Sequence, residues 1–181
     1  MKRNLLSISL LIAIAFTACA QQKKATTKGT TNTGSTQTTT EAKEAVPESA
    51  GKITTLKMTR GACFGKCPSY TIELHADGSA IYTSQMFTQY EGTFEKNVGA
   101  AKVQALFKEF EAKRTDTCGT YKSMIPDLPP LHYNIQFEKK QVEIRNATFG
   151  PKYLAELSKK VDDLTKVDGT WKKTAEAQKQ N

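Results

Sequence analysis

The sequence lacks the residue sets that mark the common classes of enzyme. Its 181 residues hold no serine, histidine and aspartate set for nucleophilic catalysis, no phosphate loop, no paired acids and no zinc-ligand spacing. Only two histidines are present. The sequence therefore gives no reason to expect a cofactor, and it favours a binding protein over an enzyme.

Long apolar segments are also scarce. The one apolar run, Leu5–Phe16, is too short to cross a bilayer, and it follows the short basic segment Met1–Asn4. This order is typical of a secretory signal, so we expect residues 1–18 to be a signal peptide. No other segment is apolar enough to span a membrane.

Small residues and a cysteine follow that run and resemble the lipobox of bacterial lipoproteins. In that family the signal is cleaved before the cysteine, which implies that Cys19 carries acyl chains. The alternative is an ordinary secretory signal with an unrelated cysteine. The resemblance also implies an envelope location. Because Ala20 stands where an aspartate favours inner-membrane retention, we expect attachment to the outer membrane, facing the periplasm.

Basic residues outnumber acidic ones, 26 to 18, but they form no basic block. Two of them, Lys2 and Arg3, belong to the predicted signal peptide. The remaining charges are interspersed, as on an ordinary soluble surface. We therefore expect no nucleic-acid partner, and the mild positive excess suits contact with anionic envelope surfaces.

Residues 19–52 are expected to form the lipidated cysteine and a flexible, threonine-rich tether. The segment has almost no large apolar residue and contains a low-complexity run at Thr38–Thr40. A flexible coil of this length has an r.m.s. span of about 30 Å. The tether would hold the following domain clear of the bilayer, although a glycosylated threonine stretch is an alternative reading of its composition.

Residues 53–171 are expected to form a single α+β domain, with a polar tail at residues 172–181. Period-two alternation and turn residues predict about six strands in a mostly antiparallel sheet, at residues 53–59, 69–75, 80–86, 89–95, 131–138 and 142–144. Apolar stripes of helical spacing predict two helices packed on one face, at residues 97–114 and 150–169.

The most informative motif is Cys63-Phe64-Gly65-Lys66-Cys67-Pro68-Ser69-Tyr70, followed by Asp77-Gly78. This pattern resembles a bacterial family known as domain of unknown function 6438. The resemblance extends from Ile53 to Trp171 and includes the Asp127-Leu128-Pro129 loop. It implies the extent of the fold and export of the protein, and it implies no activity.

Three cysteines remain after Cys19, and an oxidising compartment favours a disulfide. Loop-closure entropy is worth about 2 kcal/mol for a Cys63–Cys67 bond and about 4 kcal/mol for a bond from either residue to Cys118. Proximity favours the short bridge, and Gly65 allows positive φ in the turn. We prefer Cys63–Cys67 as a structural bridge and keep a bridge to Cys118 as the alternative.

A second interpretation of the same cysteines is thiol redox or Cu(I) chemistry. Two cysteines spaced by three residues and followed by proline also resemble the copper-carrying Sco proteins. Thiolates of Cys63 and Cys67 with an imidazole of His132 or His75 would suit Cu(I). Against this, a strand rather than a helix is expected after Pro68, and both histidines fall on polar strand faces.

Residues around the motif are candidates for contact with a protein or cell-wall partner. Arg60 and Lys66 flank Phe64 and Tyr70, and exposed aromatics with arginine often mark contact sites. The simpler alternative is that Phe64 and Tyr70 pack in the core while the cations are solvated. Asp127 is a further candidate, although an aspartate in such a loop commonly binds its own backbone.

Overall fold

The computed structural model describes residues 48–125 and 127–177. The predicted signal peptide, Cys19 and the tether before residue 48 lie outside these residues and stay predictions. Within the described part of the chain, neither helix reaches the length and apolarity needed to cross a membrane.

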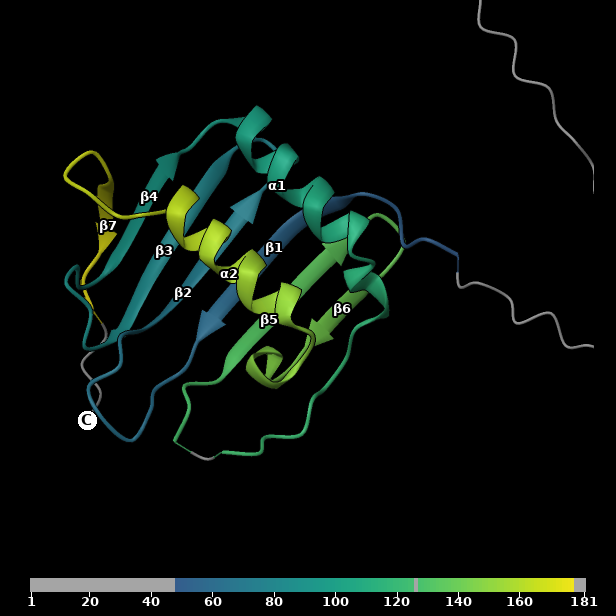
Figure 1. Cartoon of the computed structure of the whole chain (residues 1–181). Coiled ribbons are helices and arrows are strands. Elements are labelled where there is room, and N and C mark those ends of the chain that lie inside the picture. The colour runs from purple at the N-terminus through teal and green to yellow at the C-terminus, as the bar shows by residue number, and fades with distance from the viewer. Residues whose placement is uncertain (1–47, 126, 178–181) are drawn as a thin grey trace, which may run out of the picture. The chain divides into compact units, whose positions relative to one another are not determined.

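The described residues form a seven-stranded antiparallel sheet with two helices on one face, which confirms the predicted α+β class (Figure 1). The strands are β1 (Ile53–Arg60), β2 (Ser69–His75), β3 (Ser79–Met86), β4 (Thr93–Asn97), β5 (Leu131–Phe137), β6 (Gln141–Ile144) and β7 (Lys172–Ala175). Their order in the sheet is β6-β5-β1-β2-β3-β4-β7. The helices are α1 (Ala100–Ala112) and α2 (Lys152–Leu164), and short 3-10 turns lie at Thr115–Thr117 and Ala147–Phe149.

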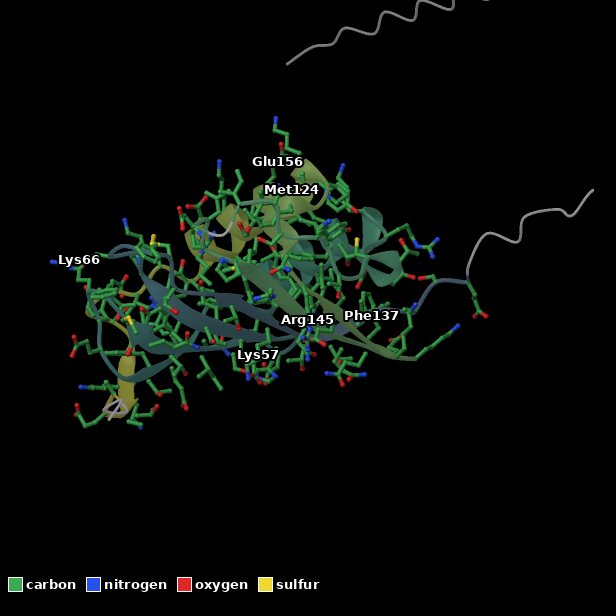
Figure 2. All side chains as sticks on the ribbon, turned by 90° about the horizontal axis from the view of Figure 1, so that it is seen from below. Lys57, Lys66, Met124, Phe137, Arg145 and Glu156 are labelled. Atoms are coloured by element: carbon green, nitrogen blue, oxygen red, sulfur yellow. A yellow bond between two sulfur atoms is a disulfide. The ribbon has the colours of Figure 1, made fainter. Side chains whose placement is uncertain are left out.

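Alternation along the strands divides the sheet into a buried face and an open face. In β5, Leu131, Tyr133, Ile135 and Phe137 are buried beneath the helices. The predicted stripe of α1 is buried against them through Val103, Leu106, Phe107 and Phe110. Lys57 and Arg145 point away from the opposite, open face (Figure 2). The hydrophobic core therefore lies between the sheet and the two helices.

The strand count differs from the expectation of about six, because the predicted polar tail contributes β7. This strand pairs with β4 through backbone hydrogen bonds, and all four of its side chains are exposed. Buried Trp171 anchors it, since its indole Nε1 donates to the carbonyl of Lys166 at 3.2 Å. A strand with no buried side chain carries no apolar alternation, so the pattern could not predict it. The fourth strand also begins at Thr93, later than the predicted Gln89.

The register places three connecting segments, 61–68, 87–92 and 118–130, at one end of the sheet, which we call the loop end. Arg60 pairs with Tyr70 and with Leu131, and Ser69 pairs with Met86, so all three segments leave neighbouring strand ends. Figure 1 shows them along the lower side of the sheet, and Figure 2 views the molecule from that side. The described chain enters β1 from the opposite end.

Candidate functional site

A disulfide closes the turn between β1 and β2. Cys63 and Cys67 are bonded, with Cα atoms 5.6 Å apart, which is the pairing we preferred from the sequence. The amide of Gly65 donates to Cys63 Sγ at 3.3 Å. Gly65 does not adopt positive φ, so that part of the sequence argument was wrong. The bond constrains a short turn at the loop end.

The tip of this turn is exposed. The side chain of Phe64 is 95% exposed, so the interpretation that it packs in the core is wrong. Lys66 is also exposed, and within residues 48–125 and 127–177 it makes no ion pair. Figure 2 shows its side chain pointing outward from one flank of the molecule. The disulfide therefore holds an aromatic ring and a cation in solvent.

Arg60 and Tyr70, the other two candidates near the turn, are directed inward to α2. Arg60 Nε donates to Asp162 Oδ2 at 3.1 Å, and its Nη2 reaches both that oxygen and Ser158 Oγ, the latter at 3.0 Å. The Tyr70 hydroxyl donates to Asp162 Oδ1 at 2.7 Å. Both carboxylate oxygens are thus occupied, and the network joins β1 and β2 to α2.

Electrostatics keep the Tyr70 hydroxyl protonated and the Arg60 guanidinium charged at neutral pH. Burial raises the pKa of Tyr70, and the hydrogen bond to Asp162 raises it further, so the hydroxyl stays a donor. Burial opposes the charge of Arg60, but the hydrogen bond and attraction of Asp162 raise its pKa overall. The network has the features of a structural joint, with no free base or nucleophile.

Exposed large apolar side chains occur on each of the three loop-end segments. Within the part of the chain that the structure describes, they are Phe64, Met86, Phe87, Met124, Ile125 and Leu128. Three neighbouring connections carry them, together with the last residue of β3. A backbone hydrogen bond of 2.8 Å from Gly61 to Pro130 ties segment 61–68 to segment 118–130. Large apolar groups gathered on one end of a domain are typical of an interaction surface.

Asp127 lies exposed on segment 118–130, next to Leu128 in the sequence, and it takes no part in the Arg60 network. Cys118 begins the same segment and has a free thiol, with its Sγ 3.2 Å from the Tyr153 hydroxyl. The alternative bridge from Cys63 or Cys67 to Cys118 is therefore not formed. The structure brings Phe64 and Lys66 together at the tip and separates them from Arg60 and Tyr70.

The geometry gives the copper interpretation no support. Both cysteine sulfurs are in the disulfide, a strand follows Pro68, and His132 Nδ1 accepts a hydrogen bond from the Asn146 amide. His75 ends β2, about 20 Å along the strand from its start beside the turn. Among the residues described here, no three histidine, cysteine or acidic side chains cluster as a metal site would require.

Sequence reasoning missed Asp162 and most of the apolar loop residues. Asp162 lies on α2 between the apolar positions of its stripe, where a charged residue looks like part of the solvated face. Phe87, Met124 and Ile125 belong to no periodic pattern, and Met86 is the last residue of a predicted strand. Only their shared location at the loop end distinguishes them, and that location depends on strand pairing.

The fold and the site define a small α+β domain with a disulfide-closed turn at one end. The chain belongs to the family described as a domain of unknown function (DUF6438), whose model matches residues 54–165. The match includes the whole motif from Cys63 to Tyr70 and ends after α2. No curated protein matches the chain.

Proposed function

We propose that this protein is a non-catalytic binding module of the bacterial cell envelope, attached to a membrane through acyl chains on Cys19. Its loop end would bind a protein or cell-wall partner. The observation that carries the proposal is the exposure of large apolar side chains on all three segments of that end, with Phe64 95% exposed on a disulfide-closed turn. Such a preorganised apolar tip reduces the entropy lost on binding.

The position at which the chain enters the domain supports a loop end that faces away from the membrane. Residues 48–52 precede β1 at the end of the sheet opposite the loop end, where Lys139 donates its backbone amide to the Ala50 carbonyl at 3.1 Å. A tether that arrives there leaves the loop end free to face away from the attachment point. We propose that the domain lies in the periplasm, on a tether from the outer membrane.

Site-specific cross-linking in the bacterial envelope tests the binding proposal. A photoreactive amino acid in place of Phe64 should yield a discrete cross-linked product, whereas the same probe at Lys102 should not. Lys102 is a matched control because it is exposed, but it lies on α1 near the other end of the sheet. Equal labelling from both positions, or none from position 64, would contradict the proposal.

Processing of the precursor tests the anchor separately. Blocking the signal peptidase that processes lipoproteins should leave the full precursor uncleaved, and Cys19→Ser should abolish labelling with radioactive palmitate. A chain that matures normally under the block would show that Cys19 is not the anchor. The binding surface at the loop end would be unaffected by that result.

A further inference from the structure

A pocket of about 240 Å³ opens beside the disulfide turn. It lies on the helix-bearing face of the sheet, near the end of α2, and its walls include Pro68, Tyr70, Tyr82, Tyr90, Thr165 and Lys166. Pro68 belongs to segment 61–68 and Tyr90 to segment 87–92, so two of the three loop-end segments also form this pocket. Small-molecule sites usually measure about 300–1,000 Å³, so the pocket suits one inserted side chain.

Three tyrosine rings, those of Tyr70, Tyr82 and Tyr90, line the wall, and Phe94, which is not part of the lining, packs against two of them. Tyr70 and Tyr82 have ring centroids 5.5 Å apart, Tyr82 and Phe94 6.3 Å, and Phe94 and Tyr90 5.9 Å. The four rings thus form a continuous row across β2, β3 and the start of β4. Aromatic pairs at such separations attract one another beyond the burial of their area. A further ring placed in the pocket would extend the row.

The polar side chains of Tyr70, Asp162 and Thr165 in the pocket floor are already paired within the protein. The Tyr70 hydroxyl and Arg60 occupy the two oxygens of Asp162, and Thr165 Oγ1 donates to the Val161 carbonyl at 2.7 Å. A sugar would need several free donors and acceptors to replace its bound water. An apolar group needs none, so the floor favours an apolar occupant.

The rim of the pocket is positive. Lys166 lines it, is exposed, and has no ion pair among the residues placed by the structure. The charge of Asp162 is balanced by Arg60, so the pocket offers no net attraction for a cation. The Phe64-Gly65-Lys66 tip of a second copy would bring another lysine to this rim. Charge therefore favours a carboxylate next to the inserted ring.

We propose that this pocket binds an aromatic side chain of an extended partner segment, with an acidic residue beside it at Lys166. The inference rests on the proposed function, because the pocket shares segments 61–68 and 87–92 with the loop end. It adds the chemistry of the partner: a phenylalanine or tyrosine flanked by aspartate or glutamate.

Fluorescence anisotropy of the full-length mature protein in detergent tests it, with the labelled peptide Gly-Gly-Phe-Glu-Gly as the probe. Serine in place of phenylalanine should weaken binding by at least about tenfold, because the ring is no longer buried. Lysine in place of glutamate should weaken it by about fivefold. Equal affinity for the serine peptide, or no binding of the first peptide, would overturn the inference.

Two variants and one control variant locate the site. Lys166→Glu should reverse the preference between the glutamate and lysine peptides, whereas Lys159→Glu, an exposed change on α2 outside the pocket, should leave it unchanged. Tyr90→Ala should weaken the binding of every peptide that carries an aromatic residue. If Lys159→Glu also reverses the preference between the two peptides, the peptide does not bind in this pocket and the inference is rejected.

Competition experiments separate the other occupants. Displacement of the peptide by chitotriose would assign the pocket to a glycan, and displacement by phosphatidylglycerol vesicles would assign it to a membrane; either result overturns the inference. Self-association that Phe64→Ser abolishes would do the same in favour of a second copy. If Lys166→Glu fails to alter peptide binding while position 64 still cross-links in the envelope, the proposed function stands and only the pocket assignment fails.

Discussion

The guanidinium Nε of Arg60 donates to the carboxylate of Asp162 at 3.1 Å, although 102 positions separate the two residues in the sequence. The hydroxyl of Tyr70 occupies the other oxygen of that carboxylate. The last residue of β1 is thereby fixed to α2 immediately before the disulfide turn begins. The helix, the turn and the neighbouring pocket are therefore expected to move as one unit.

Asp162→Ala should destabilise the domain by about 2 kcal/mol, because Arg60 and the Tyr70 hydroxyl would lose their shared partner in a partly buried site. Urea denaturation followed by fluorescence measures the change. Asp163→Ala is the matched control, since Asp163 is exposed and should change the free energy of unfolding by no more than about 0.5 kcal/mol. Equal effects of the two variants would show that the Asp162 network contributes nothing to stability.

Replacing both Cys63 and Cys67 with serine should leave the fold intact and lower its stability by about 2 kcal/mol or less, because the loop they close is short. Thermal unfolding monitored by circular dichroism measures this. Intact-mass analysis provides the chemical check on the mature protein. Alkylation after denaturation without reductant should label Cys118 alone, and reduction should expose two more thiols. Labelled Cys63 and Cys67 before reduction would favour the thiol redox interpretation.

Asp116→Asn should weaken the domain at neutral pH and have no effect in acid. The hydrogen bonds from Arg114 lower the pKa of buried Asp116, and burial opposes them only in part. Because the pKa is lower in the folded protein, the charged carboxylate stabilises the fold above its unfolded pKa of about 3.9, and this contribution is lost as pH falls through the folded pKa.

We expect Asp116→Asn to cost about 1 kcal/mol at pH 7. The difference in free energy of unfolding between the variant and the parent protein should disappear below about pH 4. Urea titrations at several pH values measure it. Asp127→Asn, a change at an exposed loop position, serves as the control and should leave the curves superimposed. A difference in free energy of unfolding that stays constant with pH would show that the effect of the substitution at position 116 is steric.

Gly78→Ala should destabilise the domain more than Gly99→Ala. Both glycines have positive φ, +91° and +101°, so alanine is strained at either position by about 1 kcal/mol. At Gly78 the added Cβ would also lie 2.4 Å from the backbone nitrogen of Ala100, whereas nothing lies within 4 Å at Gly99. Chemical denaturation of both variants measures the difference in free energy of unfolding. Equal decreases would mean that the backbone at Ala100 shifts to accommodate the added Cβ without loss of stability.

Much of the fold followed from periodicity, for a physical reason visible in β5. Its apolar residues alternate because only one face of the strand is covered by the helices. The positions of Leu131 and Tyr133 therefore identify the buried face from the sequence. The apolar stripe of α1 likewise identifies the buried face of that helix. β7 could not be predicted this way, because backbone pairing with β4 holds it and none of its side chains is buried.

The candidate site was predicted in part. The motif identified Cys63, Cys67 and the tip between them, since a short loop with two cysteines limits their pairing. It could not separate Phe64 from Tyr70, because both are aromatic residues beside a turn; one is exposed and the other bonds to Asp162. Whether each side chain points into solvent or toward α2 depends on where α2 packs on the sheet. The sequence does not give the position of this helix.

The sequence alone determined the short-range features, the alternating strands and the two helical stripes, and it favoured the bridge between cysteines four residues apart over the alternative to Cys118. These depend on neighbours along the chain, whose geometry the backbone fixes. Tertiary structure alone decided that segments 61–68, 87–92 and 118–130 meet at one end, and that Arg60 and Asp162 meet behind them. Those meetings require strand register and helix docking, which arise from burying one common core rather than from any local pattern.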